Sequence, residues 1–114
     1  MQDALSAKFA ALADRTRRDM LNRLALGELT LADLAKPLQM TVPAVAKHLA
    51  VLERAGFVTR SRPGKSVARP AKLQIAALAE MADWIEKSRV HWEGSFHRLA
   101  AYLETPEAGG SADV

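Results

Sequence analysis

Residues 30–56 read TLADLAKPLQMTVPAVAKHLAVLERAG, and they contain the start and stop signals of two short helices. The hydroxyl of Thr30 can cap a helix whose sequence is LADLAKPL. Pro37 discourages that helix from continuing, because proline lacks a backbone N–H and restricts the residue before it. The stretch therefore predicts a short helix that is followed by a break.

The second helix of this stretch, VPAVAKHLAVLERAG, has clearer limits. Thr41 caps it, Pro43 falls in its first turn, where a missing N–H is harmless, and Gly56 stops it. At 100° per residue, one face must pack inward, and its members are Val45, Leu49 and Leu52. The outward side carries Pro43, Ala44, Lys47, Ala50, Val51 and Arg54, with Ala46 and His48 at its flanks.

Two further helices are expected before this pair. Helical spacing of apolar residues predicts the first, through Leu5, Phe9, Leu12 and Ala13. Asp14 is a good N-cap for the second, which we expect to end at Gly27.

After Gly56 the spacing of the apolar residues is no longer helical, and this change predicts a β-hairpin. FVTRSR (57–62) and KSVARPAKL (65–73) read as its strands, and Pro63 and Gly64 favour a type II turn between them. Pro70 confines the second strand to an edge of the sheet, because proline cannot donate to a ladder.

The last predicted helix is the longest. Apolar or small residues recur at steps of three and four, at Leu78, Met81, Ile85, Ser88, Trp92, Phe96, Leu99 and Leu103. The tail TPEAGGSADV (105–114) is small, polar and rich in glycine, so we expect it to be disordered. We therefore expect one folded domain over residues 1–104.

Positive charge is concentrated in residues 34–79, the basic segment. It holds eight Lys or Arg residues and one acid, Glu53, for a net charge of +7. The rest of the chain has eight basic and twelve acidic residues, which give −4. Such a distribution suggests one face built for a polyanion. An ordinary solvated surface is the alternative, but it usually mixes both signs.

Composition narrows the class of protein. A chain of 114 residues with 49% hydrophobic residues can bury a modest core as a single domain. The absence of cysteine excludes disulfides, thiolate metal sites and thiol chemistry. No segment resembles a signal peptide or a membrane span, so we expect a soluble cytoplasmic protein without membrane partners.

Two short helices and a basic hairpin form the plan of a winged helix-turn-helix, mainly α with a small β-hairpin wing. Its second helix, residues 42–54, lies in the major groove of double-stranded DNA. Small side chains let this helix approach the bases, and cations on the helix and wing bind phosphates or guanine acceptors. Because few side chains can read bases, DNA shape should contribute to specificity. The candidate DNA-binding residues are Thr41, Pro43, Ala44, Ala46, Lys47, His48, Arg54, Arg60, Arg62, Lys65 and Arg69.

The motifs LADRTRRDML (12–21), GELTLADLA (27–35), PAVAKHLAVLERAGFV (43–58) and RSRPGK (60–65) resemble the ArsR-type (ArsR/SmtB) family of winged-helix repressors. The resemblance covers nearly all of the chain up to Glu104. Two positions depart from the family pattern. Arg15 stands where proline is common, and Ala46 replaces a common serine, which removes one DNA-contacting hydroxyl.

The resemblance implies a homodimer held by the first and last helices, with two recognition helices about 34 Å apart on an inverted repeat. The expected interface residues are Leu5, Phe9, Leu12, Met81, Trp84, Ile85, Trp92, Phe96, Leu99 and Leu103. The alternative is that the last helix folds back onto its own domain.

The metal-binding branch of this family carries cysteines where Thr30 and Ala32 stand, so the resemblance implies a repressor without that metal site and without a cofactor. A zinc site of histidine and carboxylate ligands is the other possibility. His91 and His97 point about 240° apart on a helix and cannot share a site within one chain. Glu93 and His97 do share a face, which leaves open a weak site between subunits.

Three classes of function follow from these observations. The first is a dimeric operator-binding repressor, controlled by an unidentified small ligand, a partner or its own concentration. The second is a winged helix that binds another protein through Trp84, Trp92 and Phe96, although such a module does not need the basic segment. An enzyme is not expected, because no phosphate-binding loop or catalytic grouping is present.

Overall fold

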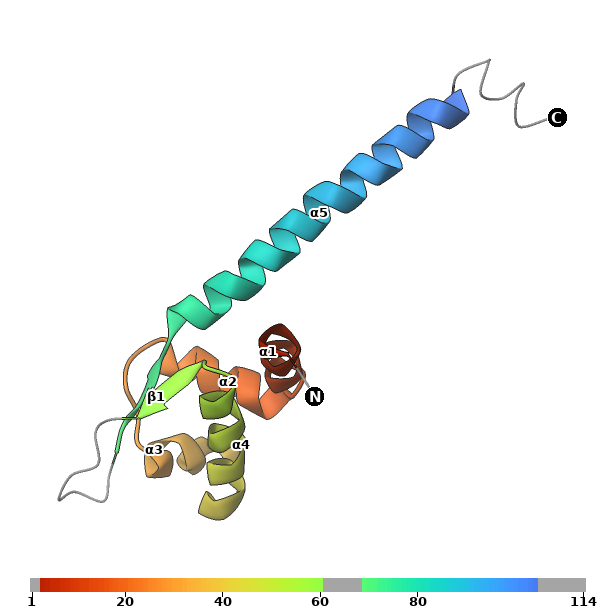
Figure 1. The fold of residues 1–114 in the computed structure, drawn as a ribbon. Helices are drawn as coiled ribbons and strands as arrows, with labels where there is room; N and C mark the ends of the chain where they lie inside the picture. The colour runs from red at the N-terminus through yellow and green to blue at the C-terminus, as the bar shows by residue number, and fades with distance from the viewer. Residues whose placement is uncertain (1–2, 61–68, 105–114) are drawn as a thin grey trace. The chain divides into compact units, whose positions relative to one another are not determined.

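The computed structural model describes residues 3–60 and 69–104, and Figure 1 gives the order of the elements along the chain. The chain divides into two compact units, Met1–Met81 and Ala82–Val114, which we describe separately. The Pro63–Gly64 turn and the tail from residue 105 lie outside the described residues, so the predictions made for them stay predictions.

The first two helices begin at aspartate caps. Helix α1 (Ala4–Leu12) starts after Asp3, whose Oδ1 accepts a hydrogen bond of 2.7 Å from the Ser6 N–H. Helix α2 (Arg15–Leu24) starts after Asp14, as predicted, and its Oδ1 accepts from the Arg17 N–H at 3.0 Å. The predicted end of α2 at Gly27 was wrong by three residues. The N–H of Gly27 bonds to the carbonyl of Leu24 at 3.2 Å, which closes a tighter turn instead of an α-helical one.

Helix α3 (Leu31–Ala35) begins with a capping box. The Thr30 hydroxyl accepts from the Asp33 N–H at 3.2 Å, and the Asp33 carboxylate accepts from the Thr30 N–H at 3.4 Å. Pro37 lies in the short 3₁₀ helix η1 (Lys36–Leu38), so the break expected at this proline is confirmed as a change of helix type. Gln39 then turns the chain with a left-handed φ of 52°.

Helix α4 (Val42–Arg54) has the limits that the sequence predicts. The Thr41 hydroxyl accepts from the Ala44 N–H at 3.2 Å, and Pro43 lies in the first turn. Gly56 follows the helix at a φ of 88°, a left-handed conformation that glycine adopts without strain.

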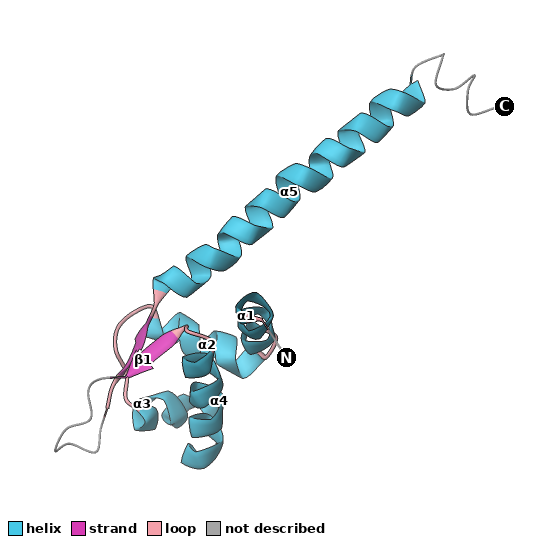
Figure 2. Ribbon diagram, in the orientation of Figure 1, coloured by secondary structure: helices cyan, strands magenta, loops and turns pink. Residues whose placement is uncertain are grey.

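The hairpin consists of β1 (Val58–Arg60) and β2 (Ala71–Leu73), which pair in antiparallel register with Val58 opposite Leu73. Figure 2 shows both strands in magenta. Ala71 also exchanges two backbone hydrogen bonds with Leu29, of 2.7 and 3.2 Å. Strand β2 is an edge strand of a two-stranded sheet, as predicted, and an isolated bridge with Leu29 adds a second partner at Ala71 alone. Pro70 is tolerated because it stands just before the strand.

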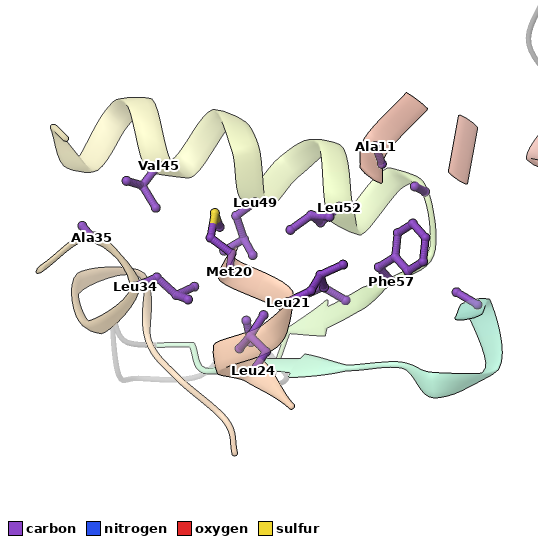
Figure 3. Close-up of a cluster of buried hydrophobic side chains, with 14 of the residues drawn as sticks. Ala11, Met20, Leu21, Leu24, Leu34, Ala35, Val45, Leu49, Leu52 and Phe57 are labelled. Carbon is purple, nitrogen blue, oxygen red and sulfur yellow. The ribbon is translucent and has the colours of Figure 1, made fainter. Parts of the chain in front are cut away.

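The core of the first unit lies where α4 faces α2 and α3. Val45, Leu49 and Leu52 are at most 1% exposed and point toward Met20 and Leu21, as Figure 3 shows. The inward face predicted for α4 is therefore confirmed. Leu34, Ala35 and Phe57 complete this part of the core.

Helix α5 (Ile75–Glu104) runs through the boundary between the units. Within the first unit, Ala77 and Met81 are buried, and the Nζ of Lys8 lies 3.1 Å from the Glu80 Oε2. In the second unit, none of the described residues, 82–104, is buried. No helix in the described part of the chain has the length and hydrophobicity of a membrane span.

Candidate nucleic-acid interface

The side of α4 that faces away from the core is the candidate surface for DNA. Val42, Pro43, Lys47 and Arg54 are exposed on it, and Ala44, Ala46 and Ala50 are partly exposed. The other side chains named here are small or apolar, and the exposed acid Glu53 lies near the C-terminal end of the same helix. Such a helix can enter a groove closely and still donate hydrogen bonds to phosphates or base edges. Val42 was missing from the predicted set, although its place next to the N-cap could have suggested it.

At the start and on the flank of α4, the predicted DNA-binding residues Thr41 and His48 have side-chain partners within the chain. The Thr41 hydroxyl caps α4, as described above. The Nδ1 of His48 lies 3.2 Å from the Nη1 of Arg17 and 3.9 Å from the Oδ1 of Asp14. The ring of His48 therefore contacts the start of α2. Arg17 is 31 residues away in the chain, and no periodicity within α4 could have identified it.

Asp14 caps α2 and also lies beside the ring of His48. The hydrogen bond from the Arg17 N–H, with a smaller contribution from the Arg17 guanidinium, holds the pKa of the Asp14 carboxyl below the ordinary value of 3.8. The cap of α2 is therefore ionised at neutral pH, as an anion at a helix N-terminus should be.

The wing cations are only partly within the described residues. The Arg60 side chain is 19% exposed, and its Nε donates to the Arg69 carbonyl at 3.0 Å. Its Nη1 lies 3.8 Å from the Oε1 of Glu53, the one acid of the basic segment. Arg60 thus connects β1 to the chain before β2 and to α4. Arg62 and Lys65 lie outside the described residues.

A further arginine fixes the helix-turn-helix and was not expected from the sequence. Arg23, at the end of α2, donates to the carbonyls of Leu34 and Asp33 at 2.8 and 2.7 Å. These carbonyls lie in the last turn of α3, where intrahelical partners run out. Arg23 therefore holds α3, the helix that precedes α4.

The second unit presents an apolar surface. The large apolar side chains of α5 that are 44–72% exposed in this unit are Trp84, Ile85, Val90, Trp92, Phe96, Leu99, Tyr102 and Leu103. The rings of Trp84 and Trp92 meet edge to face at 6.5 Å. Val90 and Tyr102 were not among the predicted interface residues, and Val90 lies about 120° from Phe96 around the helix, away from the stripe through Trp92 and Leu99.

The remaining predicted interface residues lie in the first unit. Leu5, Phe9 and Leu12 are partly buried against the core. Met81 is 6% exposed and belongs to the core of its own chain, because it lies on the part of α5 that packs within this unit. Met81 can therefore add little area to a contact with another molecule.

Two of the positions considered for a metal have partners within the chain. The Thr30 hydroxyl caps α3, and the Glu93 carboxylate accepts from Arg89 at 2.6 Å. Two carboxylates, Glu86 and Glu93, raise the pKa of the Arg89 guanidinium. Within residues 3–60 and 69–104, no three His, Cys, Asp or Glu side chains gather closely enough to hold a metal ion.

Comparisons with known proteins identify the class of regulator. A model of the bacterial regulatory proteins of the arsR family matches residues 14–60, from the cap of α2 to the end of β1. The uncharacterised HTH-type transcriptional regulator YuzN of Bacillus subtilis (strain 168) is 50% identical over 66 residues, which are 52% of this chain and 72% of YuzN. The transcriptional repressor SdpR of the same organism is 29% identical over 77 residues, which are 68% of this chain and 83% of SdpR.

Solved structures agree with these relatives. An ArsR-like transcriptional regulator from Rhodococcus sp. RHA1 has a TM-score of 0.73 and 31% identity, and the match covers 89% of this chain and 91% of that protein. A homodimeric winged helix-turn-helix DNA-binding domain from Mycobacterium bovis has a TM-score of 0.61 over 78% of this chain and 82% of its own, at 22% identity, so this likeness concerns the fold. The relatives are regulators of transcription and not enzymes, as the sequence predicted.

Proposed function

Because this chain belongs to the ArsR family of DNA-binding transcriptional regulators, we propose that it is a homodimeric repressor that binds an inverted-repeat operator. The likeness to SdpR, a transcriptional repressor, supports repression as the mode of regulation. Residues 1–104 supply both DNA binding and dimerisation.

The outward face of α4 carries this proposal. Its small side chains allow the helix to lie deep in the major groove, where Lys47 and Arg54 reach phosphates or guanine acceptors. The N-terminus of α4, with Thr41 as its cap, suits a nearby phosphate because helix N-termini attract anions. With so few base-reading side chains, much of the specificity comes from DNA shape.

The wing contributes mainly positive charge. Arg60 is held by the Arg69 carbonyl and by Glu53, so it fixes the base of the hairpin while it adds to the local potential. Arg62, Lys65 and Arg69 bind the DNA backbone beside the groove that α4 occupies.

Dimerisation is supported by the apolar side chains of the second unit. A patch that contains Trp92, Phe96 and Leu99, all more than half exposed, is unusual on a soluble monomer. A second copy of the same helix offers the matching surface, as in the isologous contacts of two-fold dimers. Leu5, Phe9 and Leu12 of α1 are proposed to add to this contact.

Repression is proposed to work without a bound metal. Thiolate ligands are absent from the chain, and soft metals are held mainly by such ligands. Of the remaining candidates, Glu93 is engaged by Arg89.

The test is binding to a duplex taken from the region upstream of the protein's own coding sequence, followed by fluorescence anisotropy over a salt series. We expect a Kd of about 10⁻⁸ M at physiological salt. Six to ten phosphate contacts per dimer should give a slope of roughly −5 to −9 in log K against log salt. No binding, or binding that salt does not weaken, contradicts the proposal.

A further inference from the structure

The guanidinium of Arg17 is anchored on the end of α1. Its Nε donates to the Ala11 carbonyl at 2.6 Å, and its Nη2 donates to the Ala10 carbonyl at 3.1 Å. Both carbonyls lie in the last turn of α1, where the usual intrahelical N–H partners run out, and the Ala10 carbonyl also accepts from the Ala13 N–H at 3.2 Å. Because the guanidinium is planar and two of its nitrogens are fixed, the direction of the third nitrogen is fixed as well.

The third nitrogen reaches the recognition helix. Arg17 Nη1 lies 3.2 Å from His48 Nδ1, and since arginine can only donate, Nδ1 is the acceptor. Asp14 Oδ1 is 3.9 Å from the same Nδ1 and would need a proton there. The 3.2 Å contact with Arg17 favours an Nδ1 without a proton, because the 3.9 Å distance to Asp14 is too long for a hydrogen bond. In this arrangement Nδ1 therefore accepts from Arg17, and the ring N–H is on Nε2.

The space beside this contact is hollow. A cavity of about 360 Å³ is lined by Ala7, Ala10, Ala11, Arg17, Val51, Arg54 and Ala55. Ala11 and Ala55 are buried in the core beside it, but the short side chains of the α1 alanines do not fill the hollow. Arg17 belongs to this lining and makes the contact with His48 on α4.

We infer that Arg17 and His48 are positioning residues for operator binding, which set the orientation of α4 relative to the end of α1. The inference rests on the proposed placement of α4 in the major groove, and it assigns His48 to positioning instead of direct DNA contact. Hydrogen bonds to base edges need donor–acceptor distances of 2.7–3.2 Å, whereas attraction to phosphates tolerates small shifts. A loss of positioning therefore weakens specific binding and spares non-specific binding.

Two substitutions of one histidine separate positioning from direct contact. In the full-length His48→Asn protein, the amide oxygen takes the place of Nδ1 and can still accept from Arg17. In His48→Gln the amide reaches the place of Nε2 and leaves Arg17 without its acceptor. Affinity is measured by anisotropy for the upstream duplex and for a shuffled duplex of the same composition.

We expect His48→Asn to keep most of the affinity for the upstream duplex and His48→Gln to lose about tenfold, as for one charge-assisted hydrogen bond. Both variants should bind the shuffled duplex as the wild type does. Arg17→Lys keeps the charge but loses the planar guanidinium with its several N–H donors, so it should weaken specific binding. In the double variant, His48→Gln should cause little further loss of affinity. Far-UV circular dichroism checks that each variant is folded.

Several results overturn the inference. The first is that His48→Asn loses as much affinity for the upstream duplex as His48→Gln, or more. The second is that neither variant loses affinity. The third is that the losses of His48→Gln and Arg17→Lys add up in the double variant. Lys47→Ala serves as the reference for direct contact. If it weakens binding while both His48 variants match the wild type, the positioning role fails and the proposed function stands. If the wild type does not bind the upstream duplex, the proposed function itself fails.

Discussion

At the scale of single residues, the two adjacent side chains Lys47 and His48 illustrate two different roles on one helix. Lys47 is exposed on the outward side of α4, whereas the ring of His48 turns toward α2 and meets Arg17. A step of one residue rotates a helical side chain by about 100°, enough to move it from the DNA face to the flank. Charge and position on the helix therefore have to be considered together.

Replacing Lys47 with alanine should weaken binding to the upstream duplex and to the shuffled duplex alike. If the lysine contacts one phosphate in each subunit, the loss should also reduce the salt slope by about 1.8 per dimer. Anisotropy at four or more salt concentrations measures both quantities. The matched control is Lys87→Ala on α5, where the ammonium pairs with Asp83 at 2.9 Å. Equal losses in the two variants contradict a specific role for Lys47.

Periodicity could predict which way Lys47 and Val45 point, because both depend only on the 100° step within α4. Charge and the winged-helix plan placed Arg60 among the DNA-binding cations, but they did not predict that its guanidinium is held by the Arg69 carbonyl and lies near Glu53. Partners such as Arg17 for His48 come from other elements. A single sequence does not record which elements meet, and local patterns therefore could not reveal them.

At the scale of elements, caps and breakers explain why most helix limits were predictable. Thr30, Thr41 and Asp14 each accept from a backbone N–H three residues ahead, and their side chains make these starts visible in the sequence. The bridge between Leu29 and Ala71 had no such signal, because it depends on how a loop passes the hairpin. Local chemistry thus predicts where elements start, and tertiary packing decides the rest.

The cap of α2 should make part of the stability depend on pH. The pKa of Asp14 is lowered in the folded protein, mainly by the Arg17 N–H, so folding favours the carboxylate. Its stabilising contribution is present above the ordinary value of 3.8 and is lost as the pH falls through the lower folded-state value. Asparagine also caps helices but does not titrate.

We therefore expect Asp14→Asn to show less acid destabilisation than the wild type below about pH 4. Thermal unfolding, followed by circular dichroism between pH 2.5 and 7, gives the comparison. The pH values are chosen above and below the ordinary pKa of a carboxyl group. Asp83→Asn is the control, because this exposed carboxylate is in the second unit and pairs only with Lys87 among the contacts described above. Identical acid profiles for wild type and Asp14→Asn contradict the role given to the cap.

At the scale of the whole molecule, control by a metal can be tested without knowledge of the operator. We expect affinity for the upstream duplex to agree within about twofold in EDTA and in micromolar zinc, because no thiolate site exists to change the dimer. Anisotropy with the same protein sample provides the measurement. If zinc releases the DNA and Glu93→Gln abolishes that effect, the weak site considered between subunits is real and the metal-free proposal is wrong.

The last prediction concerns the apolar side chains of the second unit, since an operator with two half-sites requires two copies. Phe96→Glu places a charge on a side chain that is 72% exposed and central to that surface. If the surface pairs with a second copy, the buried charge should shift a micromolar dimer to monomer and weaken operator binding. Ala101→Glu adds the same charge to the same helix but faces roughly the other way at 100° per residue, so it should remain dimeric. Sedimentation equilibrium distinguishes these states, and a monomeric wild type, or a dimer in both variants, means that this surface has another use.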